Sequence, residues 1–288
     1  MQLFLGIGAQ KSGTTWVYHQ LKRHPQVLFP GGKEFHFWDL VPDMPAAHWL
    51  EHLSPPSISG CSGVTHCGEI TPSYALLSSE TVGTIQRACP DLKVFIVLRN
   101  PIERAWSAAL MALDRCQMTL EEASDQWFID HVFSRASRSR GDYLSTIRTW
   151  QKHFGGNQFA VLFYDQIAKA PDAFLNQLSR HLGIDGTFFA DSPVEELAVP
   201  VVPTLSSQQR LTPIDRKLNQ LAARPGVLSE LHRLYDAPIL ALQEQLQLPL
   251  EHWIQSTPSS SEGEQTRQVL EVAVGGSGFA LVSQLLRS

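Results

Sequence analysis

The sequence predicts an α/β fold, a three-layer sandwich in which a central parallel sheet is covered by helices on both faces. Short apolar runs are typical of buried strands, and here they alternate with segments whose apolar residues recur at helical spacing. Alternation of this kind indicates parallel strands joined by crossover helices. With 288 residues, of which 43% are hydrophobic and 18% charged, the chain is long enough to bury such a core.

Five segments are the predicted strands. The clearest is Lys93 to Leu98, in which every residue after the lysine is apolar. Turns rich in glycine and proline, such as Pro30-Gly31-Gly32, separate the runs from the segments that follow. The predicted strands cover residues 3–7, 27–29, 64–70, 93–98 and 159–164.

Helices are predicted between these strands from apolar periodicity and from helix start and stop signals. Pro25 ends the first helix, Pro101 suits the first position of another, and Gly183 closes a third. The predicted helices cover residues 14–24, 79–88, 101–110, 119–133, 142–154, 171–182, 213–223 and 227–247, and Trp253 is expected to pack against the last. Irregular structure is expected at residues 40–60, with room for one helical turn, at 134–141 and at 190–213.

Composition limits the functions that the chain can have. A net charge of −5 argues against non-specific nucleic-acid binding, which needs a basic face. No apolar run approaches the roughly 20 residues of a membrane span, and the N-terminus enters the first strand without a secretory signal. The four cysteines lack the paired spacing of metal ligands, although Cys61 and Cys67 could close a disulfide in an oxidising compartment. We therefore expect a cytoplasmic protein with free thiols.

A turn of small residues, Gly8 to Thr15, joins the first strand to the first helix with the sequence GAQKSGTT. The backbone N–H groups of such a turn and the helix N-terminus attract anions, and Lys11 adds a full positive charge. The standard nucleoside-triphosphate loop reads G-x-x-x-x-G-K-[ST], whereas Lys11 precedes Gly13 by two residues. An anion site is therefore predicted without the usual ATP or GTP motif. A plain turn with one exposed lysine is the alternative.

A second candidate anion site follows the clearest strand. Arg99 comes directly after Leu98, at the carboxyl edge of the sheet, where open α/β folds bind ligands. Ser107 lies two turns into the helix that follows. A guanidinium offers a bidentate fork to a phosphate, and a hydroxyl adds one donor. A surface arginine and a serine bonded to its own backbone would explain the same residues without a ligand.

These two stretches carry a resemblance to a known family. The stretch KSGTTW resembles the 5′-phosphosulfate loop of the sulfotransferases that use 3′-phosphoadenosine-5′-phosphosulfate (PAPS), and RNPIERAWS is similar to their 3′-phosphate motif. By this resemblance Arg99 and Ser107 hold the 3′-phosphate. The residues implied at the 5′-phosphosulfate are Lys11, Ser12, Gly13, Thr14, Thr15 and Trp16.

A candidate general base lies at Glu34. Transfer of a sulfuryl group to a hydroxyl needs a positioned group that removes the proton, and Glu34 and His36 project to the same side of an extended segment. Their segment, KEFHFWD, resembles the E-x-H-F-F-D stretch of heparan-type and related bacterial sulfotransferases, which implies Glu34 as the base with His36 lining the site. His36 ranks second as the base. A solvated Lys–Glu pair beside core aromatics is the alternative.

Other segments match the family less well. The stretch GEITPSY looks like the G-E-K-[ST]-P-x-Y stretch of this branch, but Ile70 replaces its lysine, and Lys33 is the candidate substitute. Glu69 is expected either at the base or acceptor, or as a buried structural carboxylate. Arg140 begins an R-G-x-Y segment that the resemblance places near the nucleotide. The late K-G-R-x-H loop is absent, and Arg210 is the nearest basic residue in that region.

The residues and the resemblance together predict a PAPS-dependent sulfotransferase with P-loop-like topology. One domain is expected over residues 1–255, followed by a linker and tail of unknown role at 256–288. Lys11 and backbone dipoles supply the positive charge, so no metal is expected. The acceptor is a hydroxyl or amine of a glycan, lipid or small metabolite. The alternatives are a P-loop kinase and a non-catalytic binder of 3′-phosphoadenosine-5′-phosphate (PAP).

Overall fold

A computed structural model describes residues 1–41, 43–54, 63–191 and 223–255 of the chain. The chain divides into two compact units. The first comprises Met1–Arg99 and Thr146–Val201, and the second comprises Asn100–Ser145 and Val202–Ser288. The predicted domain over residues 1–255 stays a prediction, and the predicted helix at 213–223 and the tail at 256–288 lie essentially outside the described residues.

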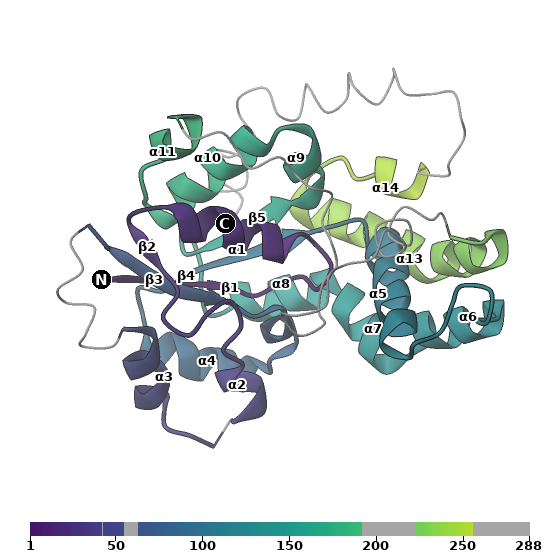
Figure 1. Ribbon diagram of the computed structural model, residues 1–288, viewed down its shortest axis with the longest axis horizontal. Helices are drawn as coiled ribbons and strands as arrows, with labels where there is room; N and C mark the ends of the chain where they lie inside the picture. Colours follow the sequence, from purple (N-terminus) through teal and green to yellow (C-terminus); the bar gives the residue numbers. More distant parts are fainter. Residues whose placement is uncertain (42, 55–62, 192–222, 256–288) are drawn as a thin grey trace. The chain divides into compact units, whose positions relative to one another are not determined.

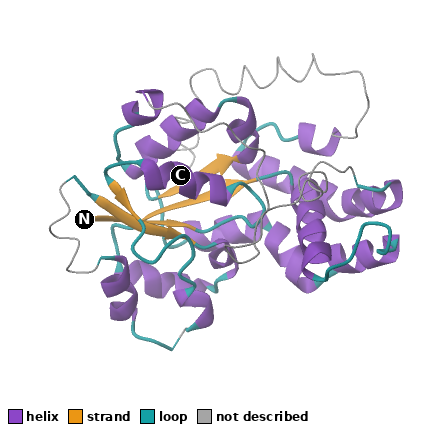
Figure 2. Cartoon of the chain, in the orientation of Figure 1, coloured by secondary structure: helices purple, strands orange, loops and turns teal. Residues whose placement is uncertain are grey.

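The first unit contains a five-stranded, all-parallel sheet with the order β2-β3-β1-β4-β5 (Figures 1 and 2). Its strands are β1 (Gln2–Gly6), β2 (Val27–Leu28), β3 (His66–Ile70), β4 (Lys93–Leu98) and β5 (Phe159–Phe163). Each predicted strand is present, and the predicted α/β fold with a parallel sheet is confirmed. β1 lies at the centre, and its last residue, Gly6, is level with Ile70 on β3 and Phe95 on β4.

Helices cover both faces of this sheet (Figure 1). One face carries α1 (Thr14–Arg23), α9 (Tyr164–Lys169), α10 (Pro171–Leu182) and α11 (Thr187–Asp191). The other carries α2 (Phe37–Leu40), α3 (Ala46–Leu53), the 3₁₀ helix η2 (Pro72–Leu76) and α4 (Ser79–Ala88), and α8 (Tyr143–Gln151) contacts η2 through hydrogen bonds. Local capping residues fix the helix ends. Ser78 caps α4 through its hydroxyl, and Gly183 ends α10 in the left-handed conformation.

The core beneath the anion-site loop is built from aromatic and aliphatic side chains. Phe4 on β1 is fully buried and meets the ring of Phe29 edge-on at 5.5 Å. Trp16 on α1 packs edge-on against Phe174 on α10, with ring centroids 5.8 Å apart. Burying these large side chains contributes about 1.5–3 kcal/mol each. The packing therefore fixes α1, and with it the loop, against the sheet.

The second unit is helical. Its described helices are α5 (Pro101–Arg115), α6 (Asp125–Phe133), α7 (Arg135–Gly141), α13 (Pro225–Leu246) and α14 (His252–Gln255). Asn100 starts α5 by accepting a hydrogen bond from the Ile102 N–H at 3.0 Å, and Pro101 occupies the first helical position. The Asn100 amide also donates to the Trp253 carbonyl at 2.8 Å. Trp253 is buried in α14, which packs against α13, so the expected docking is confirmed.

Some predicted boundaries were wrong. Arg135–Gly141, within the loop predicted at 134–141, form helix α7, because the Ser134 hydroxyl caps the helix by accepting from the Ser137 N–H at 3.2 Å. The helix predicted from residue 119 begins at Asp125, where Ser124 is the cap. Tyr164 starts helix α9 instead of ending a strand, and α3 is eight residues long where one helical turn was expected.

Candidate active site

The loop after β1 is paired to the neighbouring strand. Beyond the end of β1, the Ala9 N–H donates to the Val97 carbonyl at 2.9 Å, and the Val97 N–H donates to the Gly8 carbonyl at 2.8 Å. These bonds carry the β1–β4 ladder past Gly6 and hold the base of the loop at the carboxyl edge of the sheet. The turn itself, from Gln10 to Gly13, then leads directly into α1.

Two residues of this turn have left-handed backbone, Lys11 with φ of 67° and Gly13 with φ of 80°. Gly13 is the N-cap of α1, and no side chain caps the helix there. A Cβ at Gly13 would lie 2.9 Å from Ile167 and 3.0 Å from Tyr164, so glycine is required by both conformation and space. The N–H groups of the first helical turn have no intrahelical partners. They therefore form a site for an anion.

Ser12 supports this interpretation. Its side chain is fully buried, and its Oγ has no hydrogen-bond partner among the residues that the structure describes. A buried hydroxyl without a partner costs free energy unless a bound group completes it. The loop thus combines a buried hydroxyl, an uncapped helix start and a lysine, which is a donor set that fits a phosphosulfate.

Arg99 joins the loop. Its Nη1 donates to the Lys11 carbonyl at 3.2 Å, and its guanidinium lies over the Tyr164 ring, 4.6 Å from the ring centroid. Arg99 follows β4, so strand pairing brings the residue that begins the second predicted anion motif to the first. The contact also braces the left-handed turn at Lys11.

The other predicted nucleotide contacts are less direct. Thr14 is buried and Thr15 is exposed in the first turn of α1, while the Trp16 ring lies in the core. Ser107 is buried in α5 of the second unit, and its contact with a 3′-phosphate stays a prediction. Arg210 lies outside the described residues.

Arg140 lies in α7 of the second unit and donates to the Ala136 carbonyl at 2.9 Å. Partial burial, together with the positive charges of Arg104 and Arg115, lowers the pKa of Arg140. Gly141 and Tyr143, from the same R-G-x-Y segment, line a cavity of about 620 Å³ with Tyr235 of α13. The predicted nucleotide contact of Arg140 stays a prediction.

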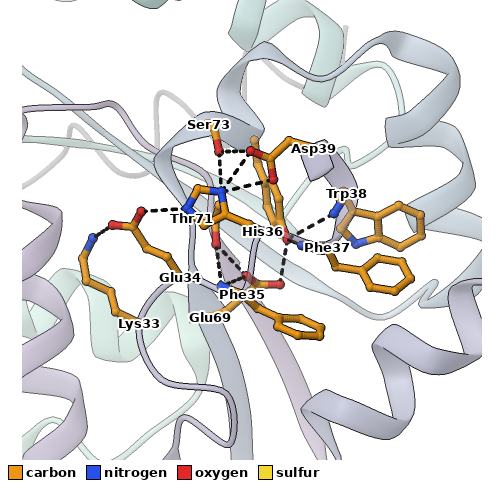
Figure 3. Close-up of polar contacts among 11 residues, drawn as sticks. Lys33, Glu34, Phe35, His36, Phe37, Trp38, Asp39, Glu69, Thr71 and Ser73 are labelled. Atoms are coloured by element: carbon orange, nitrogen blue, oxygen red, sulfur yellow. Dashed lines mark hydrogen bonds and ion pairs between the residues drawn. The ribbon is translucent and has the colours of Figure 1, made fainter. Parts of the chain in front are cut away.

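The candidate base belongs to a continuous chain of polar contacts (Figure 3). One oxygen of Glu34 forms a short ion pair with Lys33, and the other lies 3.2 Å from His36 Nε2. His36 Nδ1 lies 2.9 Å from Asp39 Oδ2, which also accepts a hydrogen bond from the Ser73 hydroxyl at 2.6 Å. The Glu34 side chain remains 35% exposed. It can therefore accept a proton from a group arriving from solvent.

The two ring nitrogens of His36 face two carboxylates. Desolvation lowers the pKa of His36, but the hydrogen bond and charge of Asp39 and the charge of Glu34 outweigh it and raise the pKa above 6.5. The pKa of Lys33 is lowered by burial, against the opposing effect of Glu34. The arrangement concentrates groups that exchange protons within a few residues.

The expected proximity of Glu34 and His36 is observed, but not in an extended segment. His36 has left-handed backbone with φ of 59° and precedes the four-residue helix α2. This turn also brings in Asp39, which the sequence analysis did not select although it lies three residues after His36. Ser73 was missed as well, and its only signal was its place in the GEITPSY stretch.

Backbone pairing places this chain of contacts beside the loop. The Ile70 N–H donates to the Lys33 carbonyl at 2.7 Å, and the Thr71 N–H donates to the Gly6 carbonyl at 2.9 Å. The segment that carries Glu34 therefore lies at the carboxyl end of β3, next to the end of β1. With Arg99 after β4, three adjacent strands present candidate residues at one edge.

Within the part of the chain that the structure describes, no group of three or more His, Cys, Asp or Glu side chains has the arrangement of a metal site. The same residues include no helix with the length and apolar character needed to cross a membrane. The predicted cytoplasmic location stays a prediction.

Comparison with known proteins identifies the family. The model of the sulfotransferase domain matches residues 3–209, which is more than half of the chain. The chain belongs to the sulfotransferase family. This confirms the resemblance drawn from the loop, the Arg99 motif and the Glu34 segment, because all three lie inside the matched residues.

Relatives of this sulfotransferase-family chain include heparan sulfate glucosamine 3-O-sulfotransferase 6 from Mus musculus. It is 26% identical over 181 residues, which are 62% of this chain and 51% of the mouse protein. The human protein of the same name matches equally, with 26% identity. The chain thus spans about half the length of these curated relatives.

A solved structure shares the fold. The sulfotransferase from Alicyclobacillus acidocaldarius superposes with a TM-score of 0.60 and 21% identity, covering 88% of this chain and 98% of that one. The likeness supports the arrangement of a parallel sheet covered by helices that is described above.

Proposed function

We propose that this chain transfers a sulfuryl group from PAPS to a hydroxyl or amine of an acceptor. The observation that carries the proposal is Glu34, a partly exposed carboxylate held between Lys33 and His36 at the sheet edge beside the anion-site loop. A base and an anion site on adjacent strands are what this reaction requires. Membership of the sulfotransferase family supports the same conclusion.

The loop is proposed to hold the donor. Lys11, the Ser12 hydroxyl and the N–H groups of Thr14 and Thr15 would contact the phosphosulfate, while Arg99 and Ser107 would contact the 3′-phosphate. Positive charge placed where negative charge develops stabilises the transition state. Lys11 and the α1 N-terminus supply that charge, so the proposed reaction requires no metal.

Glu34 is proposed as the general base. It would take the proton of the acceptor hydroxyl as the acceptor oxygen bonds to sulfur and the bond between sulfur and the 5′-phosphate oxygen breaks. His36, held by Asp39, would keep the Glu34 side chain in place and carry positive charge beside it. The products are the sulfated acceptor and PAP.

Lys33 is proposed as the second cation of the site. The family places a lysine at position 70, but Ile70 is fully buried in the apolar core beneath the loop. The Lys33 carbonyl accepts the Ile70 N–H, so Lys33 comes from the neighbouring backbone, and its Nζ contacts Glu34. The base therefore has a lysine next to it, but this lysine is residue 33 and not the last residue of β3.

The acceptor is proposed to be a hydroxylated glycan, lipid or small metabolite. The mouse relative is named for a heparan sulfate glucosamine. A polymer of that kind is densely anionic, and the net charge of −5 on this chain favours less charged acceptors. An acceptor screen with ³⁵S-labelled PAPS, run in the presence of EDTA, tests both the reaction and its independence from metal.

Glu34→Gln tests the mechanism. The change keeps the size of the side chain but removes its basicity, so the transfer rate is expected to fall by about 10²–10⁴-fold. Affinity for PAP, measured by calorimetry, should change less than about twofold, because the nucleotide contacts come from other residues. Glu80→Gln, on the exposed start of α4, is the matched control and should leave the rate unchanged.

The outcomes separate the alternatives. A Glu34→Gln protein that transfers at the wild-type rate excludes Glu34 as the base. Tight PAP binding by the wild type without transfer to any acceptor would instead indicate a non-catalytic nucleotide binder. Transfer of the γ-phosphoryl group of ATP to an acceptor hydroxyl, with release of ADP and dependence on Mg²⁺, would indicate a kinase.

A further inference from the structure

The segment that carries Glu34 and His36 is attached to the fold through its backbone N–H groups. The Phe35 N–H donates to Glu69 Oε2 at 3.0 Å. The Phe37 N–H donates to the Tyr74 hydroxyl at 2.9 Å, and the Trp38 N–H lies 3.4 Å from the same oxygen. Residues on both sides of His36 are therefore tied to two side chains that lie elsewhere in the sequence, Tyr74 and Glu69, of which Glu69 is labelled in Figure 3.

These two side chains are bonded to each other. The Tyr74 hydroxyl donates to Glu69 Oε1 at 3.1 Å, and the same oxygen accepts from the Trp49 indole at 2.9 Å. Oε2 accepts from the Thr71 hydroxyl at 2.6 Å in addition to the Phe35 N–H. Glu69 is 1% exposed, and Tyr74 and Trp49 are fully buried. The carboxylate thus receives four hydrogen bonds in a site closed to water.

A buried carboxylate is costly, and apolar residues could fill the same volume without that cost. Desolvation raises the pKa of Glu69, while its four hydrogen-bond donors act in the opposite direction. Burial also raises the pKa of Tyr74, which keeps its hydroxyl protonated and able to donate. Two of the groups that Glu69 and Tyr74 satisfy, the N–H groups of Phe35 and Phe37, flank His36.

The turn at His36 needs such support. A left-handed backbone is unfavourable for a residue with a side chain. Helix α2, which follows, has only four residues, too few to be stable alone. No side chain of the N-cap residue caps it, and its first N–H groups instead donate to the Tyr74 hydroxyl. The conformation that brings His36 to both Glu34 and Asp39 therefore depends on contacts from β3 and η2.

We propose that Glu69 and Tyr74 are positioning residues, which hold the left-handed turn at His36 and thereby set the geometry of Glu34, His36 and Asp39. This proposal rests on the proposed function, since it assigns these residues to the same reaction. Neither side chain contacts Glu34 or His36, so both act through the backbone. Small displacements of a reacting group lower the rate strongly: a displacement of about 1 Å can reduce it about 10²-fold.

Tyr74→Phe and Trp49→Phe form a matched pair for the test. Each removes one donor to Glu69 Oε1 from a fully buried aromatic residue. Only Tyr74→Phe also removes the acceptor of the Phe37 and Trp38 N–H groups. We expect Tyr74→Phe to lower kcat by about 10- to 100-fold, with KM for PAPS within about twofold, and Trp49→Phe to lower kcat by less than about threefold at a comparable loss of Tm.

Hydrogen exchange gives a second measurement that does not depend on chemistry. Exchange at the N–H groups of Phe37 and Trp38 should accelerate by at least about tenfold in Tyr74→Phe and not in Trp49→Phe, because only the former loses their acceptor. Glu69→Gln should likewise accelerate exchange at Phe35. Both oxygens of Glu69 accept hydrogen bonds, and the NH₂ group of glutamine cannot accept in place of one of them. Loop residues 11–15 should exchange as in the wild type.

The two proposals fail in different ways. If wild-type protein transfers sulfuryl to no acceptor, the proposed function fails, whereas the exchange result still decides whether Glu69 and Tyr74 hold the turn. Equal losses of kcat in Tyr74→Phe and Trp49→Phe, or unchanged exchange at Phe37 in Tyr74→Phe, would overturn the positioning role.

Discussion

Glu34 shows how much of this site is set by individual side chains. Its two oxygens have different partners, the Lys33 ammonium on one side and the His36 ring on the other. Each partner has a further contact that limits its movement: Lys33 through its carbonyl bond to Ile70, and His36 through Asp39. A carboxylate held in this way loses little conformational freedom when an acceptor arrives.

Lys33→Met tests whether Lys33 acts as the second cation. The substitution keeps the length and apolar stem of the side chain but removes the charge next to Glu34. We expect kcat/KM to fall by about 10- to 100-fold, an effect of the size that loss of a charged transition-state contact produces. Lys93→Met is the control. Lys93 is the first residue of β4, at the opposite end of the strand from Arg99, and its ammonium donates to the Asn157 carbonyl, so it has no proposed role in the site. Equal activity of the two variants would exclude Lys33.

His36→Asn tests the charge on the imidazole through stability. Because the pKa of His36 is raised above 6.5 in the folded protein, its contribution is complete below the unfolded pKa of about 6.5 and is lost as pH rises through the folded value. The variant should be less stable than wild type by about 0.2–1 kcal/mol more at pH 6 than at pH 9. Urea unfolding at both pH values measures this.

The control for that experiment is His153→Asn. This substitution removes a ring that contacts the neutral hydroxyl of Ser79 instead of a carboxylate. A His36→Asn difference that is constant between pH 6 and pH 9 would contradict a charged imidazole.

Sequence reasoning reached Glu34, His36 and Lys33 but not Asp39 or Ser73, and the reason is physical. The spacing of Glu34 and His36 is visible in one segment, and so is the acidic residue that follows. The turn that brings Glu34, His36 and Asp39 together depends on Glu69 and Tyr74. These two residues are far from the segment in the sequence, and strand pairing brings them into contact with it. Nothing in a single sequence states that His36 adopts a left-handed conformation.

At the level of elements, capping residues determine where a helix starts when apolar periodicity does not predict it. The stretch at 134–141 looks polar enough for a loop, yet one serine hydroxyl at its start is sufficient to begin α7. Strands with continuous apolar runs were predicted closely, because β4 is buried on both faces after Lys93 and tolerates few polar residues. Short helices such as α9 carry too few residues to show a period.

Gly13→Ala tests the start of α1. The new Cβ would meet Ile167 and Tyr164 at about 3 Å and would force a left-handed alanine. We expect a stability loss of about 1–3 kcal/mol and a loss of PAP affinity of at least about tenfold, because the N–H groups of the anion site shift. Thermal unfolding and calorimetry measure the two effects.

Gly183→Ala provides the comparison. Gly183 also has a left-handed backbone, with φ of 86°, but the nearest atom to its Cβ position is 3.9 Å away. This variant should lose about 1 kcal/mol and bind PAP as the wild type does. If both variants keep full affinity for PAP, the loop at Gly13 is not the phosphosulfate site.

For the whole molecule, strand order matters more than any motif. Each strand overlaps a predicted strand segment, and parallel packing was predictable from the alternation with helices. The order β2-β3-β1-β4-β5, however, is what puts the loop between Arg99 and the Glu34 segment. The predicted motifs were separate in the sequence analysis, and pairing of β3 and β4 with β1 brings their first-unit residues to one edge.

The sheet also contains a group that couples stability to pH. His181 on α10 is buried, and its Nε2 lies 2.9 Å from the Val94 carbonyl on β4, so the neutral ring donates there. Burial and the nearby charge of Lys93 lower the pKa of His181 to about 4. Above pH 6.5 the ring is neutral in both folded and unfolded chains, and it contributes no pH dependence.

His181→Gln is therefore expected to flatten the acid side of the stability curve. Between pH 6.5 and about pH 4 the unfolded chain binds a proton that the folded chain does not, so wild-type stability falls as pH is lowered. The difference of about 2.5 pKa units corresponds to roughly 3 kcal/mol. Because carboxylates titrate in the same range, the quantity to compare is the unfolding free energy of the variant minus that of wild type at pH 7 and pH 4.5. The exposed His19→Gln is the control, and a His181→Gln curve parallel to wild type would show that His181 does not govern the loss of stability in acid.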